Sequence, residues 1–399
     1  LRGVISLGAQ PADGMLGWQP LQAMAAQVGA EQLRECSAQL QFDEPINIQY
    51  SSGTTGFPKG ATLSHYGVLN NGYLVGENLG LGEHDRVVIP VPLYHCFGMV
   101  VGNLACLTHG SCMIYPGAAF DPLAVLQAVA EERATALYGV PTMFIALLDH
   151  PARAGLDLSS LRTGIMAGAT CPIELMRRVI DELHMGEVQI AYGMTETSPV
   201  SLQTAPHDDL ERRVSSVGRT QPHLESKIVD AQGRIVPRGQ VGELCTRGYS
   251  VMLGYWNNPA ATSEVLDSAR WMHSGDLASM DDDGYVKIVG RNKDMIIRGG
   301  ENLYPREIEE FLFTHPAVAD VQVIGVPDSK YGEEVVAWIR LHPGQAVEPE
   351  ALREYCHGRI AYFKTPRYIK IVDSFPLTVT GKVQKRQLRE ISVLELGLH

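Results

Sequence analysis

A run of glycine and hydroxyl side chains stands near residue 50 of this 399-residue chain. Its residues are Ser51, Ser52, Gly53, Thr54, Thr55, Gly56, Phe57, Pro58, Lys59 and Gly60. Glycines let the backbone turn so that its N–H groups face a phosphate, hydroxyls add donors, and the lysine adds positive charge. A Walker A loop would need Gly-Lys-Ser or Gly-Lys-Thr at the start of a helix, and the run does not have it. The run predicts a phosphate-binding loop of another kind, with a polar surface turn as the alternative.

Four further blocks follow this run along the chain. They are Tyr192-Gly193-Met194-Thr195-Glu196, Ser274-Gly275-Asp276, Gly290-Arg291-Asn292-Lys293-Asp294 and Pro376-Leu377-Thr378-Val379-Thr380-Gly381-Lys382. In this order the five blocks resemble the motifs of the adenylate-forming superfamily, which includes acyl-CoA synthetases, luciferases and the adenylation domains of peptide synthetases, and the resemblance covers nearly the whole chain. It implies that the later blocks are, in chain order, an adenine and Mg²⁺ motif, a ribose-binding aspartate, a hinge between two domains and a loop with a mobile catalytic lysine. It also implies ATP, Mg²⁺ and coenzyme A as cofactors or co-substrates.

The first of these later blocks has side chains suited to its implied role. Tyr192, which precedes Gly193, can stack on adenine, and Thr195 can donate a hydrogen bond to the α-phosphate. Glu196 can hold Mg²⁺ as a hard oxygen ligand. The alternative is that Thr195 and Glu196 are a polar pair that caps a helix, and the two roles can coexist.

The charged residues of the remaining blocks suit a nucleotide that reacts with a carboxylate. Asp276 can accept hydrogen bonds from both ribose hydroxyls and Arg291 can donate to the same sugar, although each could instead form an ordinary salt bridge. Lys293 is the implied hinge. A carboxylate that attacks an α-phosphate meets anion–anion repulsion and needs no base, so catalysis falls to positive charge from Lys382 and Mg²⁺. The alternative for Lys382 is a solvated lysine in a basic run.

Two features favour coenzyme A as the acyl acceptor. Gly299 and Gly300 lie beside the hinge, where in this family a thin backbone lets pantetheine pass, although a simple turn is the alternative. We also expect no carrier-protein module after the lysine loop. Within the superfamily, residues 92–98 and 295–305 resemble medium-chain fatty acyl-CoA synthetases.

The acyl pocket is expected from the same resemblance. His95 matches the aromatic gate to the acyl pocket in that family, although a lone histidine is more often structural. Gly168 is one of several small residues near strand ends, where a pocket is expected in an α/β sheet. The other small residues of this kind are Gly98, Gly139 and Ala169.

The elements that must hold these residues form an α/β pattern. Between residues 61 and 241, apolar strand-like runs alternate with helical segments, which predicts a parallel sheet flanked by helices. Residues 218–290 carry short alternating runs with glycine-rich turns, which predicts antiparallel strands or a small β-barrel-like part. After these residues a new pattern of strands and helices begins. We therefore expect a large N-terminal AMP-binding domain over 1–291 and a small mobile C-terminal α/β lid domain over 294–399.

Composition limits the partners and the compartment. The formal net charge of −12 argues against nucleic acid or an anionic membrane as the main partner. The 7 cysteines are scattered, without a C-x-x-C pair, which favours a reducing intracellular and cytoplasmic setting over a disulfide framework or a zinc site. No apolar run is long enough to cross a bilayer. The chain begins at Leu1, so we expect a missing upstream segment of the N-terminal domain, and an organelle matrix is possible if that segment carries a targeting signal.

These observations predict a two-step ligase. A carboxylic acid, expected to be a medium-chain fatty acid, and ATP give acyl-AMP and pyrophosphate, and coenzyme A then takes the acyl group. Two alternatives stay open, which are a truncated nucleotide-binding protein without turnover and a ligase for an aromatic acid.

Overall fold

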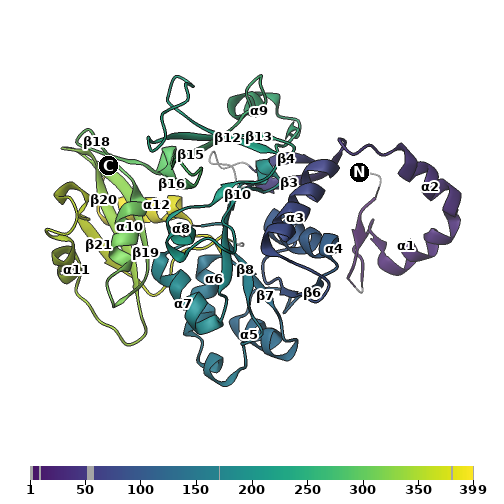
Figure 1. Cartoon of the computed structure of the whole chain (residues 1–399), viewed down its shortest axis with the longest axis horizontal. Coiled ribbons are helices and arrows are strands. Elements are labelled where there is room, and N and C mark those ends of the chain that lie inside the picture. The colour runs from purple at the N-terminus through teal and green to yellow at the C-terminus, as the bar shows by residue number, and fades with distance from the viewer. Residues whose placement is uncertain (1–2, 9, 52–57, 170, 379–380, 399) are drawn as a thin grey trace. The chain divides into compact units, whose positions relative to one another are not determined.

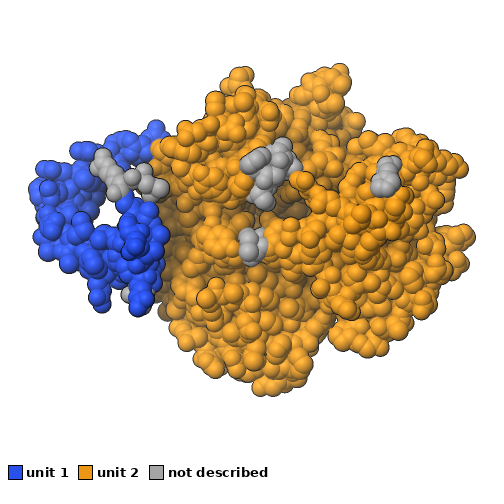
Figure 2. Space-filling model, turned by 180° about the vertical axis from the view of Figure 1, so that it is seen from behind, with its two compact units in different colours: residues 1–44 blue, residues 45–399 orange. Residues whose placement is uncertain are grey.

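The computed structural model describes residues 3–8, 10–51, 58–169, 171–378 and 381–398. The chain divides into two compact units, residues 1–44 and residues 45–399, which Figure 2 colours blue and orange. No helix within these described residues is both long and apolar enough to cross a membrane.

The first unit is small and has no buried residue among those described. Two short strands, β1 (Ile5–Ser6) and β2 (Leu16–Gly17), pair in parallel. They are followed by α1 (Trp18–Met24), the 3₁₀ turn η1 (Ala25–Gln27) and α2 (Ala30–Gln39). This unit therefore lacks a hydrophobic core of its own.

The second unit is built around a seven-stranded sheet with the strand order β11-β10-β9-β8-β7-β5-β6. The five strands from β6 to β9 are parallel, and β10 and β11 add an antiparallel edge. The parallel sheet predicted from the alternating pattern is therefore confirmed. Its strands are β5 (Arg86–Val88), β6 (Cys112–Ile114), β7 (Ala136–Gly139), β8 (Thr163–Ala167), β9 (Glu187–Gly193), β10 (Val200–Gln203) and β11 (Arg219–Thr220).

Helices cover both faces of this sheet (Figure 1). Alternate residues of one strand face opposite layers, as the period of two requires. In β7, for example, Tyr138 packs with the α3–α4 side and Leu137 with the α5–α7 side, and both are fully buried. One layer holds α3 (His65–Leu79), the π-helix η2 (Phe97–Leu104) and α4 (Ala105–His109). The other holds α5 (Pro122–Glu131), α6 (Pro141–Asp149), η3 (Pro151–Gly155), α7 (Ile173–Leu183) and α8 (Leu210–Ser215).

Two antiparallel sheets complete the part before residue 292. The sheet β12-β13-β15-β16 is open, because β12 and β16 each have one neighbour and do not pair with each other. The β-barrel-like part expected over 218–290 is therefore not a closed barrel, since β14 joins a different sheet, β14-β4-β3. The elements are β3 (Pro45–Ser51), β4 (Lys59–Ser64), β12 (Leu224–Val229), β13 (Gly242–Gly248), β14 (Gly254–Tyr255), α9 (Pro259–Val265), β15 (Met272–Met280) and β16 (Val286–Arg291).

The C-terminal part has its own five-stranded sheet, in which β21 runs parallel to β20 and the other pairs are antiparallel. Separate hydrophobic clusters lie on its two faces, one around Val323 and Ile339 and one around Val326 and Trp338. Its elements are η5 (Asn292–Asp294), β17 (Ile296–Arg298), β18 (Glu301–Leu303), α10 (Pro305–Phe313), β19 (Val318–Asp328), β20 (Gly332–Leu341), α11 (Pro349–Cys356), η6 (Tyr362–Lys364), β21 (Tyr368–Ile371) and α12 (Lys385–Glu395). The predicted boundary near residue 293 falls on η5 and stays a prediction.

A buried asparagine on α3 fixes the start of β10. The Asn71 side chain is fully buried, donates to the Val200 carbonyl oxygen at 2.7 Å, and accepts from the Val200 N–H at 3.0 Å. We predict that Asn71→Leu destabilises the protein strongly, because a buried N–H and a carbonyl group lose their partner, at about 1 to 3 kcal/mol each.

The measurement is urea unfolding followed by circular dichroism. Asn70→Leu is the matched control, since the Asn70 amide only donates to the Tyr66 carbonyl of its own exposed helix face. Equal losses of stability in the two variants would contradict the proposed bracing of β10.

Candidate active site

The parallel strands deliver three segments to one edge of the central sheet. Strands β7, β8 and β9 run in the same direction, so their carboxyl ends meet at that edge, where ligands bind in α/β sheets. The residues that follow or end these strands are Val140, Gly168, and the pair Tyr192 and Gly193. Two of the segments therefore carry residues that the sequence selected for nucleotide and acyl binding.

Gly193 allows the turn that follows β9. A methyl group at this position would lie 1.8 Å from the Pro199 carbonyl oxygen, which leaves no room for a side chain. The close approach lets the Met194 N–H donate to the same oxygen at 3.0 Å. The turn between them is the short 3₁₀ helix η4 (Thr195–Thr197), in which Thr195 and Glu196 are both buried.

The predicted adenine and ribose residues contact one another directly. The Tyr192 hydroxyl donates to Asp276 Oδ2 at 2.5 Å, and Arg291 Nε donates to Asp276 Oδ1 at 3.1 Å. Asp276 and Arg291 face each other in the register of β15 and β16. Burial, and then the negative charge of Asp276, raise the pKa of Tyr192 well above its ordinary value, so the phenol remains a donor. The structure thus brings Tyr192, Asp276 and Arg291 into one hydrogen-bonded group.

The turn that carries Asp276 is braced from β13. Glu243 Oε1 accepts from the Gly275 N–H at 3.0 Å, and Glu243 Oε2 lies 2.9 Å from His273 Nδ1. Ser274 Oγ donates to the Leu244 carbonyl oxygen at 2.6 Å. The backbone before Asp276 is therefore held at three points.

Glu196 is linked to the phosphate-loop strand by a residue that the sequence reading missed. The Tyr255 hydroxyl donates to Glu196 Oε1 at 2.7 Å, and Lys59 Nζ lies 5.2 Å from the centre of the Tyr255 ring. Tyr255 stands in β14, which pairs with β4 through sequence-distant partners. No local sequence signal predicts that pairing.

The phosphate loop is bracketed by a hairpin. Ser51 ends β3 and lies opposite Lys59, which begins β4, and Pro58 directly precedes it. The loop between Ser51 and Pro58 is not among the residues that the structure describes. It consists of the predicted phosphate-binding residues Ser52, Gly53, Thr54, Thr55, Gly56 and Phe57.

Lys382 lies in the same site although it comes from the far end of the chain. A methyl group added at Gly168 would lie 3.1 Å from Lys382 Cε and 3.8 Å from Nζ. The Thr142 hydroxyl, on α6, donates to the Gly381 carbonyl oxygen at 3.0 Å. Burial lowers the pKa of the Lys382 ammonium, and the nearby carboxylates of Asp276 and Glu196 act in the opposite direction. Gly168 thus lies beside the lysine, and its predicted place in the acyl pocket stays a prediction.

His95 and Cys96 lie close to this lysine. His95 Nδ1 accepts from the Phe97 N–H at 3.1 Å, which leaves the other ring nitrogen as the donor of a neutral imidazole. Burial, and then the positive charge of Lys382, lower the pKa of His95 to about 4. Cys96, which the sequence reading left out of the site, is buried with its sulfur 3.8 Å from the Thr195 hydroxyl.

The predicted coenzyme A residues are not brought against this group. Gly299 and Gly300 form the turn between β17 and β18 and have φ values of +61° and +88°, a left-handed pair that glycine adopts without strain. The Gly299 N–H donates to the Tyr331 carbonyl at 2.8 Å. A methyl group at Gly300 would meet no described atom within 4 Å. The predicted hinge, Lys293, lies in η5.

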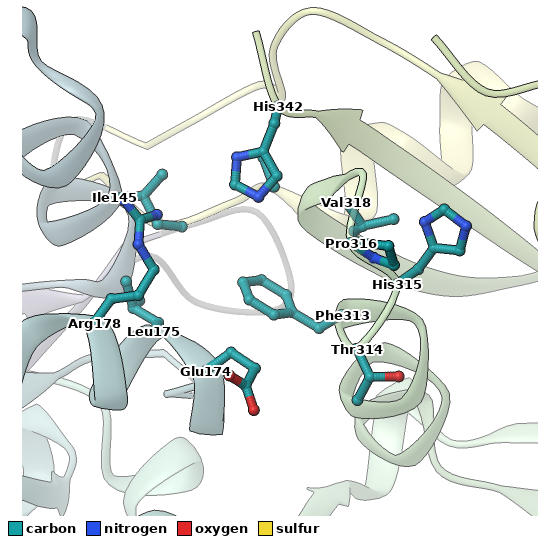
Figure 3. Close-up of a pocket in the computed structure, with 11 residues that line it drawn as sticks. Ile145, Glu174, Leu175, Arg178, Phe313, Thr314, His315, Pro316, Val318 and His342 are labelled. Carbon is teal, nitrogen blue, oxygen red and sulfur yellow. The ribbon is translucent and has the colours of Figure 1, made fainter. Parts of the chain in front are cut away.

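A separate cavity of about 230 Å³ lies between α7 and the C-terminal part. Figure 3 shows Phe313 between the α7 side chains Leu175 and Arg178 and the segment that carries His342. None of the residues selected from the sequence lines this cavity.

Two protein-family models match this chain. The family described as AMP-binding enzyme matches residues 8–256, and the AMP-binding enzyme C-terminal domain matches residues 307–382. The chain belongs to the AMP-binding enzyme family.

Individual relatives agree with this assignment. The chain is 52% identical, over 98% of its length and 72% of the relative, to YngI of Bacillus subtilis (strain 168), which is named as an acyl-CoA synthetase. It is 46% identical to the mitochondrial medium-chain acyl-CoA ligase ACSF2 of Macaca fascicularis, over all of this chain and 65% of the relative. Among solved structures it resembles the anthranilate CoA ligase AuaEII in complex with anthranoyl-AMP, with a TM-score of 0.83, 32% identity and coverage of 90% of this chain and 70% of that one.

These matches confirm the predicted family, the α/β fold and the class of enzyme, an acyl-CoA synthetase that forms an adenylate. Acyl-CoA synthetases of this AMP-binding family use ATP and coenzyme A, so those two parts of the cofactor prediction hold. The role of Mg²⁺ and the individual site roles remain predictions.

The lowered pKa of His95 gives a pH-dependent contribution to stability. Because the folded pKa of about 4 lies below the ordinary 6.5, the unfolded chain binds more protons on this group between those pH values. The contribution is therefore complete above pH 6.5 and is lost progressively as the pH falls toward 4. We predict that His95→Phe loses less stability than the wild type between pH 7 and pH 5. Denaturant unfolding at both pH values measures this, and parallel pH profiles for the two proteins would contradict it.

Proposed function

We propose that this chain activates a linear medium-chain carboxylic acid with ATP and transfers the acyl group to coenzyme A. The observation that carries the proposal is the position of Lys382, whose ammonium is buried against Gly168 beside the group formed by Tyr192, Asp276 and Arg291. A buried cation next to a nucleotide-type site suits a reaction that joins two anions.

In the first half-reaction, a carboxylate oxygen attacks the α-phosphorus of ATP. A new P–O bond forms as the bond to pyrophosphate breaks. Lys382 would stabilise the negative charge that gathers on the attacking and phosphoryl oxygens, and Lys59 and the phosphate loop would hold the departing phosphates. Asp276 and Arg291 would hold the ribose, which fixes the α-phosphate for in-line attack. Thr195 would donate to the α-phosphate.

Glu196 has the surroundings expected of a metal ligand. Its side chain is 6% exposed, its Oε1 accepts from a neutral hydroxyl, and it forms no ion pair within the described ranges. A buried carboxylate without a cationic partner is costly, so a divalent cation at this position would be stabilising. Mg²⁺ bound there would neutralise charge on the phosphates.

In the second half-reaction, the coenzyme A thiol attacks the acyl carbon and AMP leaves. Lys382 occupies the site in this structure and the Gly299–Gly300 turn does not reach it. We therefore propose that the part after residue 293 rotates about Lys293 between the two halves, so that the turn replaces the lysine loop. Both walls of the cavity in Figure 3 would then separate, since one wall comes from α6 and α7 and the other from residues 313–319.

The preference for a medium-chain acid rests on the named relatives and on the His95 segment. The small residues Gly98 and Gly139 do not support it, because methyl groups there would lie 2.4 Å from the Pro92 carbonyl oxygen and 3.1 Å from the Phe144 ring. These glycines serve close packing. The anthranilate ligase among the structural relatives favours an aromatic acid as the second candidate substrate. An intracellular location stays part of the proposal, since the named relatives include bacterial and mitochondrial proteins.

We predict that octanoate supports pyrophosphate release with a higher kcat/KM than acetate or anthranilate does. A coupled pyrophosphate assay across straight-chain and aromatic acids, with and without coenzyme A, measures this. Faster turnover of anthranilate would replace the fatty acid by the aromatic candidate. Binding of ATP without any acid-dependent pyrophosphate release would show a nucleotide-binding protein without turnover.

We predict that Lys382→Ala and Gly300→Leu separate the two halves. Lys382→Ala should slow acyl-AMP formation by about 10² to 10³, since one preorganised charge is removed, while added acyl-AMP is still converted to thioester. Gly300→Leu should form acyl-AMP normally but slow its conversion, because a side chain would fill the path of pantetheine.

Single-turnover chemistry on each half measures both effects. Gly344→Leu is the matched control, because Gly344 also has a positive φ in the C-terminal part with no described atom within 4 Å of an added methyl group. If Lys382→Ala loses both halves equally, or if Gly300→Leu and Gly344→Leu behave alike, the two conformations are assigned to the wrong residues.

A further inference from the structure

Tyr255 contacts one residue of each charge in the site. It is 9% exposed, its hydroxyl donates to Glu196 Oε1 at 2.7 Å, and its ring lies 5.2 Å from Lys59 Nζ. Lys59 belongs to the strand that follows the phosphate loop, and Glu196 belongs to the turn after β9. A single neutral side chain therefore contacts both a lysine and a glutamate, the two residues of opposite charge that would bind the phosphates of ATP and their metal.

The backbone around Tyr255 is fixed to both neighbours. In β14, Tyr255 pairs with Ala61 of β4, and the Trp256 N–H donates to the Gly60 carbonyl oxygen at 2.7 Å. The Met252 N–H donates to the Glu196 carbonyl oxygen at 2.9 Å. The position of the Tyr255 ring is thus set by the phosphate-loop strand and by the Glu196 turn together.

Both charges are available to a ligand. Within the part of the chain that the structure describes, neither Lys59 nor Glu196 forms an ion pair. If the two side chains met at about 4 Å, they would attract each other by about 4 kcal/mol at an effective dielectric of 20, and a ligand would have to break that pair. A cation over an aromatic face and a carboxylate that accepts from a phenol keep their charges while being held in place.

We propose that Tyr255 is a positioning residue that holds Lys59 and Glu196 apart, so that Lys59 meets the phosphates of ATP and Glu196 meets its divalent metal. The inference rests on the proposed function for the identity of the ligand.

The test separates the hydroxyl from the ring. Tyr255→Phe removes the donor to Glu196 and keeps the ring under Lys59, whereas Tyr255→Leu removes both. The probes are Mn²⁺, whose free signal is measured by electron paramagnetic resonance, and a non-hydrolysable α,β-methylene analogue of ATP, whose metal-free binding is measured by calorimetry in EDTA.

We expect Tyr255→Phe to weaken Mn²⁺ binding in the presence of the analogue by about tenfold or more, the usual loss for a hydrogen bond to a charged group, and to leave metal-free binding of the analogue unchanged. Tyr255→Leu should weaken both, because Lys59 can then pair with Glu196. Adding Glu196→Gln to Tyr255→Leu should restore metal-free binding, which a merely structural loss would not do.

Tyr249→Phe is the matched control. Among the described residues its hydroxyl lies 3.5 Å from the Asn71 amide nitrogen, and its ring meets Tyr66 edge-on, so binding of both probes should equal that of the wild type. Wild-type Mn²⁺ binding by Tyr255→Phe would overturn the inference. Mn²⁺ binding by Tyr255→Phe tests the inference even if Tyr255→Leu fails to fold. Octanoate-dependent pyrophosphate release by the wild type is measured in parallel, so a failure of the proposed function shows there and not in the binding arms.

Discussion

The parallel pairing of β7, β8 and β9 is the constraint on which the rest of the site depends. Because the strands run the same way, their carboxyl ends lie side by side. The residues that follow the strands are therefore close together in space without any contact between their loops being needed. Gly168 after β8 and Gly193 at the end of β9 each leave out a side chain at this edge. At Gly193 the freed space admits the Pro199 carbonyl group, and at Gly168 it admits the Lys382 side chain. The parallel sheet thus positions the turn after β9 and leaves the gap at Gly168 that Lys382 fills.

Much of this arrangement could be predicted from the local sequence. The parts that depend on pairing between strands far apart in the chain could not. The strands of the parallel sheet follow from patterns within about ten residues, and the structure has them. Of the two alternatives for residues 218–290, the structure has the antiparallel strands and not a closed barrel, and β14 pairs with β4, some 190 residues earlier. Tyr255 was overlooked for the same reason, since its contact with Glu196 exists only once that pairing has formed. Cys96 lies within the segment 92–98, but nothing near it in sequence indicates a place beside Thr195.

The charges of the site run against those of the whole chain. The formal net charge is −12, yet Lys59, Arg291 and Lys382 converge on a place where a polyanion would bind. Each of these cations is held in a different way. Arg291 shares Asp276 with the Tyr192 hydroxyl, Lys59 lies over a ring, and Lys382 is held against a glycine. At physiological ionic strength, fields from charges beyond about 8 Å are largely screened, so these local positions outweigh the net charge.

The buried position of Lys382 has an electrostatic cost. Within the described residues, a hydrogen bond from Thr142 to the Gly381 carbonyl and the close approach at Gly168 help to hold the loop there, while burial lowers the pKa of the ammonium and so disfavours its charged form. Bound ATP would offset that cost with several negative charges. When pyrophosphate leaves after the first half-reaction, most of those charges leave with it, and the buried ammonium loses its main compensation. Under the proposed rotation about Lys293, departure of pyrophosphate would therefore favour release of the lysine loop before the second half-reaction.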